Sequence, residues 1–331
     1  MKAIVFQQYG SPDFLQLKEV EKPVPKDNEV LIKVHAVSIN EWDWAILHGV
    51  PFANRLAYGL FKPRLQILGA DVAGRIEAVG NNVRRFRSGD EVFGDLCRSG
   101  WGGFAEYTCA HEKALVPKPA SLTYEQSASL PQAGLLAVQG LRKGKLQQQP
   151  VHQAKKVLIN GASGGVGTIA VQIAKSCGAE VTGVCSTAKM ELVRSLGVDH
   201  VIDYTKEDFT KNGQQYDLIL DVKATHPVLD CKHALCPAGV YILVGGASSV
   251  VNQLMLLGPL ISLTSKKKMS LLLYKPNKGL DYLIELIESG KVHPVVDKIY
   301  PLSETVDAFR YYGDGRARGK VVITVAHSAA S

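Results

Sequence analysis

A glycine-rich segment at residues 161–167 is the part of the sequence whose residue types and spacing most clearly predict chemistry. It reads Gly-Ala-Ser-Gly-Gly-Val-Gly, and it joins an apolar run at 156–160, a predicted strand, to a helical pattern at 166–177. Such a turn lets the backbone approach a pyrophosphate, while the helix N-terminus offers free N–H groups and a positive dipole end. The segment therefore predicts a dinucleotide site. The alternative is a glycine-rich turn that binds nothing.

The spacing within this segment gives each small residue a role. The dinucleotide pattern G-x-G-x-x-G is met as Ala162, Gly164 and Gly167, with alanine in the first place, and Gly161 adds a flexible position. We expect Gly164 to allow close approach of the phosphates and Gly167 to allow close packing of the helix on the sheet. The predicted cofactor contacts in this segment are Ala162, Ser163, Gly164, Gly165, Val166 and Gly167.

The end of the next predicted strand indicates which dinucleotide is bound. A site for NAD places Asp or Glu there, about twenty residues after the glycines, to hold the ribose 2′-hydroxyl. This chain has no acid in that stretch, where Ser186 and Thr187 can donate to a 2′-phosphate and Lys189 can neutralise it. The sequence therefore favours NADPH over NADH. A solvated Lys189 in the first turn of a helix is the alternative.

The elements that must position these residues follow from the pattern of apolar residues. From Lys155 onward, strand-like and helix-like runs alternate, which is typical of a doubly wound parallel sheet with helices on both faces, an α/β fold. The predicted strands are 156–160, 180–185, 200–202, 217–221 and 240–244, and the predicted helices are 126–141, 166–177, 189–196 and 279–289. The first third contains short β-like runs separated by Pro and Gly, which predict a β-rich barrel or sandwich.

Length and composition bound the remaining possibilities. A chain of 331 residues predicts two domains, and its net charge of +7 includes a single dense basic run, Lys266–Lys268, interpreted as a solvated face. The six cysteines form no C-x-x-C pair, and the N-terminus lacks the pattern of a secretory signal. The longest apolar segment, Leu254–Leu263, is interrupted by Gly258 and Pro259. We expect a cytoplasmic protein without integral membrane association and without a nucleic-acid partner.

Several further segments, together with the glycine-rich loop, resemble the medium-chain dehydrogenase/reductase superfamily. They are residues 38–43, 69–74 with 79–80, 89–92, 103–107, 130–135, 201–204, 290–297 and 319–322. The chain is most similar to the zinc-free quinone oxidoreductase branch, which includes zeta-crystallin. The resemblance implies a GroES-like substrate domain at 1–125, completed by 300–331, and a Rossmann domain at 126–299. It also implies a homodimer.

The resemblance further implies that no metal takes part. Asn40 stands where the zinc-dependent alcohol dehydrogenases have a cysteine, and Ala70-Asp71 stands where they have a His-Glu pair. Asparagine and alanine supply neither the thiolate nor the imidazole of a catalytic zinc site. A site assembled from Asp71, His48 and Cys97 is the remaining alternative.

Without a Lewis acid, conjugated acceptors are the easier substrates, because hydride addition leaves a delocalised enolate or phenolate. The hypothesis is an NADPH-dependent oxidoreductase that reduces quinones or α,β-unsaturated carbonyls. The alternatives are an alcohol or enoyl-thioester reductase and a non-catalytic NADPH-binding protein. A peripheral membrane contact through 254–268 is a separate possibility.

Individual substrate-side residues follow from the resemblance and from an insertion that it reveals. Asn40 is predicted to contact substrate, with a buried amide as the alternative, and Asp43 to orient its loop. Tyr58, in a predicted insertion at 51–61, is a candidate proton donor, with an ordinary loop tyrosine as the alternative.

Three more residues are predicted to lie along the cofactor. Tyr204 is placed beside the adenosine, or alternatively packs at a strand end. Gly245 and Gly246 are placed near the nicotinamide, or alternatively form a plain turn. Leu136 departs from the family, because relatives usually have threonine there.

Overall fold

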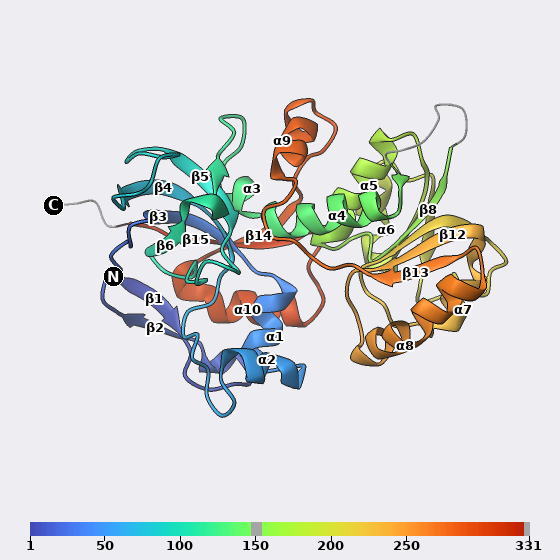
Figure 1. The fold of residues 1–331 in the computed structure, drawn as a ribbon, viewed down its shortest axis with the longest axis horizontal. Coiled ribbons are helices and arrows are strands. Elements are labelled where there is room, and N and C mark those ends of the chain that lie inside the picture. Colours follow the sequence, from blue (N-terminus) through green and yellow to red (C-terminus); the bar gives the residue numbers. More distant parts are fainter. Residues whose placement is uncertain (147–153, 328–331) are drawn as a thin grey trace. The chain divides into compact units, whose positions relative to one another are not determined.

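The computed structural model describes residues 1–146 and 154–327. The chain divides into two compact units, which are described separately (Figure 1). The first unit contains residues 1–132, 276–280 and the chain from 295 onward, and the second contains 133–275 and 281–294. The domain boundary predicted after residue 125 thus lies seven residues before the first division.

The first unit is built on a seven-stranded sheet in the order β14-β15-β3-β4-β5-β7, with β6 also paired to β3. A separate antiparallel pair joins β1 and β2. The strands are β1 (Lys2–Val5), β2 (Gln16–Glu19), β3 (Glu29–Ser38), β4 (Asp71–Val79), β5 (Glu91–Asp95), β6 (Tyr107–His111), β7 (Val116–Pro117), β14 (Val296–Pro301) and β15 (Lys320–Thr324). The helices are α1 (Glu41–His48), α2 (Phe52–Tyr58), α3 (Tyr124–Ala128) and α10 (Thr305–Gly313). This confirms the predicted β-rich architecture of the first third.

Strand β3 organises this unit because it pairs with three other strands along its length. It is antiparallel to β4, β6 and β15, and Ser38 lies opposite both Asp71 of β4 and Val322 of β15. The last strand, β15, therefore brings the C-terminal part of the chain against the N-terminal part. This register sets the first residues of β4 and β15 beside the loop that follows β3.

The second unit contains a six-stranded parallel sheet in the order β10-β9-β8-β11-β12-β13. The strands are β8 (Lys156–Asn160), β9 (Glu180–Cys185), β10 (His200–Asp203), β11 (Tyr216–Asp221), β12 (Leu235–Leu243) and β13 (Lys268–Leu271). The helices are α4 (Pro131–Lys143), α5 (Gly165–Ser176), α6 (Met190–Ser195), α7 (Val228–His233), α8 (Ser248–Thr264) and α9 (Leu280–Glu288). Numbered from β8, the order is 3-2-1-4-5-6, which is the Rossmann arrangement. The predicted doubly wound sheet is confirmed.

Helices cover both faces of this sheet (Figure 1). Residues of α7 and α8 share an apolar core with Tyr241, Leu243 and Met269 of β12 and β13. On the other face, α4 packs so closely on β11 that a Cβ at Gly140 would lie 2.6 Å from a methyl of Leu220. The chain reverses between β8 and β11, and ligands of such folds bind at the carboxyl ends of the strands beside that reversal.

Two predicted helices are wrong in detail. The predicted helix at 126–141 is two helices, α3 and α4, because Pro131 starts the second one and cannot continue the first. The predicted helix at 189–196 is preceded by a 3-10 turn at Thr187–Lys189, which makes α6 shorter.

The interruption expected in the apolar segment 254–263 does not end the helix there. Helix α8 runs from Ser248 to Thr264 with Pro259 inside it. Within the described ranges, no helix has the length and apolar character needed to span a bilayer.

Candidate active site

The phosphate loop, residues 161–167, is fixed to the sheet by backbone hydrogen bonds. The N–H groups of Gly161 and Ala162 both donate to the carbonyl of Val184 in β9, at 3.1 and 3.0 Å. The N–H of Gly164 then donates to the carbonyl of Gly161 at 3.1 Å. Gly161 has a φ of +84°, a conformation that favours glycine. Backbone hydrogen bonds therefore hold the start of the loop against β9.

The two glycines with predicted roles differ in what surrounds them. A Cβ at Gly167 would lie 2.1 Å from the carbonyl oxygen of Gly161, so only glycine lets α5 pack this closely on the loop. A Cβ at Gly164 would meet only that same oxygen, at 3.6 Å. The open space at Gly164 leaves its backbone approachable from outside, as expected for a residue that faces a phosphate.

The N-terminus of α5 suits an anion. Gly164 is the N-cap residue, and across the described parts of the chain no side chain caps this helix and no acid lies in its first turn. The first-turn N–H groups of an uncapped helix have no partner inside the helix. Ala162 is fully buried and Ser163 is nearly so, which means that backbone groups, and not their side chains, form this surface.

The residues predicted to hold the adenosine end are brought together at the ends of β9 and β10. Tyr204 follows β10, and its N–H donates to the carbonyl of Cys185, the last residue of β9, at 3.1 Å. Ser186 and Thr187 follow Cys185 directly, and Lys189 ends the same 3-10 turn. The ring of Tyr204 is 59% exposed and so is accessible to a ligand.

An acid missed by the sequence reasoning also lies here. Asp203 ends β10 opposite Cys185, and its carboxylate accepts hydrogen bonds from the hydroxyls of Thr187 and Thr205. The hydrogen bond from Thr187 lowers the pKa of Asp203 below its ordinary value, so the carboxylate is charged. The prediction considered only the end of the second strand, whereas Asp203 ends the third. The Thr187 hydroxyl, predicted to donate to a 2′-phosphate, donates to Asp203 instead.

A second unpredicted group ties the strand ends beneath the phosphate loop. Asp221, fully buried at the end of β11, accepts from Nδ2 of Asn160 and from the hydroxyl of Tyr241, each at 2.8 Å. Burial raises the pKa of Asp221 to about 6. Because Asn160 immediately precedes Gly161, this network fixes the start of the loop. The only sequence signal was a polar residue closing each of two apolar strands.

The glycines after β12 have a packing reason. Gly246 has a φ of +145°, and a Cβ on it would lie 2.4 Å from the carbonyl oxygen of Ala224. The carbonyl of Gly245 accepts from the N–H of Ala224 at 3.0 Å. These contacts support the alternative of a turn at Gly246, and the predicted approach of nicotinamide to this pair remains a prediction.

In the first unit, Asn40 belongs to a buried polar cluster around Lys320. The ammonium of Lys320 donates to Oδ1 of Asn40 and to the carbonyl of Ile39, the latter at 3.1 Å, and lies 3.8 Å from Oδ2 of Asp71. Burial disfavours both charges, so it raises the pKa of Asp71 and lowers that of Lys320. Asn40 is only 5% exposed, which supports the buried-amide alternative, and a substrate contact stays a prediction.

Asp43 has the structural role expected for it. Its two carboxylate oxygens accept from the N–H groups of Asn40 and Gly69, each at 2.8 Å. The side chain is fully buried, and burial raises the pKa of Asp43 to about 7. The loop that carries Asn40 is thereby joined to the residue before Ala70.

Tyr58 lies at the end of α2, within the predicted insertion. Its ring packs edge-on against Trp101, with ring centroids 6.2 Å apart, and burial raises its pKa. These contacts support an ordinary packing tyrosine, and its role as proton donor remains a prediction. Leu136 is half-buried on α4.

The alternative metal site is not assembled. His48 contacts the carbonyl of Trp44 through Nδ1 at 2.9 Å and stacks on that ring, while Asp71 lies against Lys320. Burial raises the pKa of Cys97. Among the residues that the structure describes, no three His, Cys, Asp or Glu side chains could hold a metal ion.

Comparison with known proteins agrees with this geometry. Residues 26–120 match the family described as alcohol dehydrogenase GroES-like domain, and residues 196–323 match the family described as zinc-binding dehydrogenase. The chain is 33% identical to the chloroplast envelope quinone oxidoreductase homolog of Arabidopsis thaliana over 98% of both chains.

Another relative is the NADPH-dependent alkenal/one oxidoreductase, chloroplastic, of A. thaliana, 33% identical over 98% of this chain and 79% of that protein. Among solved structures, the quinone oxidoreductase from Coxiella burnetii superposes with a TM-score of 0.87 at 31% identity, covering 98% of this chain and 99% of the other. The chain belongs to the medium-chain dehydrogenase/reductase superfamily, in its quinone oxidoreductase branch.

Proposed function

We propose that this protein is an NADPH-dependent oxidoreductase that transfers hydride to quinones or to α,β-unsaturated carbonyl compounds. The observation that carries the proposal is the phosphate loop, held against β9, uncapped and open at Gly164. The names of the relatives, quinone oxidoreductase and NADPH-dependent alkenal/one oxidoreductase, support the choice of acceptor and of cofactor.

The residues present fit a dinucleotide. The loop from Ala162 to Gly167 would hold the pyrophosphate through backbone N–H groups, and the exposed ring of Tyr204 would lie against the adenosine. Ser186 and Lys189 would bind the 2′-phosphate, one as a hydrogen-bond donor and the other as a point charge. Gly245 and Gly246 would lie toward the nicotinamide. NADPH, when bound, supplies the hydride.

On the substrate side, the orientation of Asn40 follows from Lys320. An ammonium can only donate, so Oδ1 of Asn40 must face Lys320 and Nδ2 must point the other way. Nδ2 lies 3.5 Å from the carbonyl of Ser38 and also interacts with the carboxyl group of Asp71, and an amide nitrogen carries two N–H groups. We assign this amide N–H as the donor that binds the substrate oxygen on which charge develops. Tyr58 is kept as the candidate donor of the final proton.

Two finer expectations belong to the same proposal. We propose that the reaction uses no zinc, because Asn40 and Ala70 hold the positions of two zinc ligands in the alcohol dehydrogenases. We also propose a homodimer, supported by β13, which is the edge strand of the six-stranded sheet in the part of the chain that the structure describes. Sedimentation velocity tests the dimer.

The cytoplasmic location stays a prediction. All six cysteines are free thiols, which suits a reducing compartment. Some relatives carry names that place them in chloroplasts.

The test is a substrate profile followed by the loss of NADPH absorbance. We expect turnover with a benzoquinone and a 2-alkenal, weaker or no turnover with an enoyl thioester or a saturated aldehyde, and slower reaction with NADH. Activity should survive dialysis against a chelator. Tight NADPH binding without turnover of any conjugated acceptor would instead favour the non-catalytic alternative. Preference for the enoyl thioester would favour the acyl-chain reductase.

A further inference from the structure

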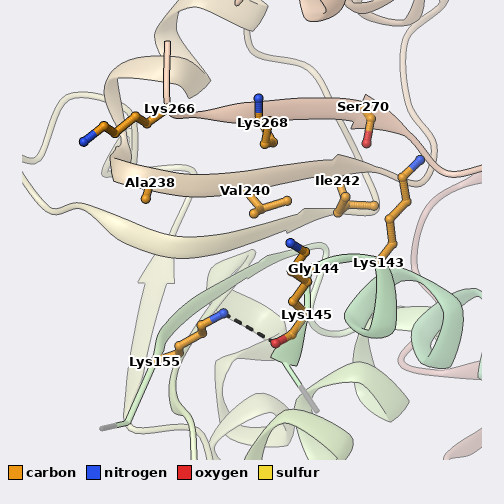
Figure 2. A pocket seen from close by; sticks show the side chains of 10 residues that line it. All are labelled: Lys143, Gly144, Lys145, Lys155, Ala238, Val240, Ile242, Lys266, Lys268 and Ser270. Atoms are coloured by element: carbon orange, nitrogen blue, oxygen red, sulfur yellow. Dashed lines mark hydrogen bonds between the residues drawn. The ribbon is translucent and has the colours of Figure 1, made fainter. Parts of the chain in front are cut away.

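A pocket of about 380 Å³ lies in the second unit, away from the phosphate loop. It is lined by Lys143, Gly144, Lys145, Lys155, Ala238, Val240, Ile242, Lys266, Lys268 and Ser270 (Figure 2). Alternate residues of β12 and β13, such as Tyr241 and Met269, face the opposite side and pack with α7 and α8. The pocket therefore occupies the face of these strands that α7 and α8 do not cover.

The lining combines an apolar floor with lysines from three separate segments. Val240 and Ile242 lie along β12, and Figure 2 shows Lys143 and Lys145 extending toward β12 and β13 from the end of α4. Lys155 enters from the residue before β8, and the ammonium of Lys266 is turned away at the rim. Of the ten described residues that line the pocket, none is Asp or Glu.

The contacts of Lys143 and Lys155 keep their positive charges at the pocket, whereas the ammonium of Lys268 is turned toward α8 (Figure 2). Lys143 donates to the carbonyl of Leu271 at 2.6 Å, Lys155 to that of Lys145 at 3.5 Å and Lys268 to that of Ser262 at 2.5 Å. These acceptors are neutral carbonyls, which orient an ammonium but do not cancel its charge.

Two of the lysines are partly withdrawn from water. Burial lowers the pKa of Lys143. Burial also lowers the pKa of Lys155, while the carboxylate of Asp217 raises it and the smaller effect of Lys145 lowers it. A bound anion would favour the charged form of both ammonium groups, which burial disfavours.

The pocket is distinct from the proposed coenzyme site. Lys155 stands just before the first residue of β8, whereas Gly161 follows its last residue. A strand of five residues spans about 17 Å, so the two sites lie at opposite ends of the same strand. A coenzyme on the phosphate loop therefore leaves this pocket open.

We propose that this pocket binds a small polyanion that carries two or more phosphate groups. Its volume falls within the range of about 300–1,000 Å³ typical of small-molecule sites. Lysines act as point charges that suit phosphate oxygens in many orientations, and several of them together favour a ligand with several negative charges. The hydroxyl of Ser270 offers a further donor on the floor. The phosphates can belong to a soluble molecule or to a lipid headgroup.

The first experiment titrates inorganic pyrophosphate into NADPH-saturated protein by calorimetry. The test variant is Lys145→Ala with Lys155→Ala, and the matched control is Lys211→Ala with Lys291→Ala, two exposed lysines of the same unit that do not line the pocket. We expect one site in the wild type, a Kd at least tenfold higher in the test variant and a change below twofold in the control. Raising the salt concentration should weaken binding because the attraction is screened.

The second experiment replaces pyrophosphate by phosphatidylcholine vesicles with and without phosphatidylinositol 4,5-bisphosphate, in a sedimentation assay with the same variants. Binding of the free anion, of the phosphoinositide vesicles or of both supports the proposal and identifies the source of the phosphates. Unchanged circular dichroism and NADPH affinity in the test variant show that it is folded. Absence of binding to both probes, or equal losses in the test and control variants, overturns the proposal.

Discussion

The polar cluster around Lys320 in the first unit differs from the sheet edge that carries the phosphate loop in the second unit, here called the open edge. The difference lies in whether the polar groups find partners within the protein. The first is closed on itself, because side chains from β3, β4, α1 and β15 meet in the interior and satisfy one another. The second is open, because backbone N–H groups at the start of α5 are left without a capping side chain among the described residues. Substitutions in the closed cluster should therefore change the free energy of unfolding, and substitutions at the open edge should change the affinity for the coenzyme.

Each site also rests on a fully buried carboxylate, and the partners differ. Asp71 lies 3.8 Å from a lysine ammonium and also accepts from the N–H of Gln132, whereas Asp221 accepts from an amide and a phenol and has no ammonium beside it among the described contacts. An ionic partner and neutral partners respond differently to substitution and to pH. Four predictions test this contrast between the units, from the largest expected effect to the smallest.

The substitution Lys320→Met should have the largest effect, because it leaves Asp71 buried without its cation. Removal of one partner of a buried ion pair costs about 3–5 kcal/mol, and we expect a loss in this range in the free energy of unfolding at a pH where Asp71 is ionised, and a smaller loss at lower pH because burial raises the pKa of Asp71. All three tryptophans, Trp42, Trp44 and Trp101, lie in the first unit, so their fluorescence during urea unfolding reports on this unit alone.

The control for this prediction is Lys298→Met, at an exposed lysine of β14. The double variant Lys320→Met with Asp71→Asn should recover part of the loss, since no buried charge then lacks a partner. A loss below about 1 kcal/mol in the single variant would show that Asp71 is already uncharged in the folded protein.

The second prediction concerns pH and Asp221. Its pKa is raised from 3.8 to about 6 in the folded state, so between these values the folded protein binds more protons than the unfolded chain. The contribution of Asp221 to the stability of the second unit should therefore decrease as pH rises from 4 to 6, by roughly 2–3 kcal/mol at about 1.4 kcal/mol per pKa unit, against an opposite trend from the carboxylates whose pKa values are lowered, such as Asp199 and Asp208.

Far-UV circular dichroism, compared with the tryptophan signal of the first unit, measures this dependence. The variant Asp221→Asn keeps the shape of the side chain and has no proton to gain, so its stability over this pH range should be flatter by that amount. If the unfolding free energies of the wild type and of Asp221→Asn changed with pH in parallel, Asp221 would not be the group that takes up the proton on folding.

The third prediction is Tyr241→Phe, which removes a neutral donor to Asp221 at 2.8 Å and leaves the buried oxygen with one partner fewer. We expect a loss of about 1–2 kcal/mol, less than for Lys320→Met because no full charge is stranded. Tyr282→Phe in α9 of the same unit is the control, and thermal unfolding is the measurement. A loss of unfolding free energy as large as that of Lys320→Met would show that losing a neutral partner costs as much as losing an ionic one, contrary to the prediction.

The same contrast explains what the sequence could predict. The phosphate loop was predictable because the small residues that shape it, Gly161, Gly164 and Gly167, lie within one turn of seven residues. The parallel sheet was predictable for a similar reason, since alternating apolar runs carry a local signal. By comparison, Lys320 and Asn40 are 280 residues apart, and only the pairing of β15 with β3 brings them together.

Asp203 was missed because its relation to the predicted cofactor residues is neither local in the sequence nor as distant as that of Lys320 and Asn40. In NAD sites the acid that holds the ribose 2′-hydroxyl lies at the end of the second strand, and this chain has no acid at that position. The parallel register of β10 on β9 places Asp203 opposite Cys185, which is part of the stretch at the end of β9 where the sequence shows no acid. Asp203 and Cys185 are eighteen residues apart in the sequence, and only the pairing of β10 with β9 makes them neighbours.

The fourth prediction, Asp203→Asn, uses this neighbour to test the open edge, and it rests on the proposed NADPH site. The charged carboxylate holds the Thr187 hydroxyl and adds negative charge where a 2′-phosphate is expected. Its removal should lower the KM for NADPH by about two- to threefold, a small effect because water screens these charges, and leave the KM for NADH unchanged. Lys189→Ala should act in the opposite direction for NADPH alone, with Lys291→Ala as the neutral control. A higher KM for both cofactors in Asp203→Asn would mean instead that the carboxylate positions the 3-10 turn at Thr187–Lys189 through the Thr187 hydroxyl. The open edge would then depend on internal hydrogen bonds between side chains, as the closed cluster of the first unit does.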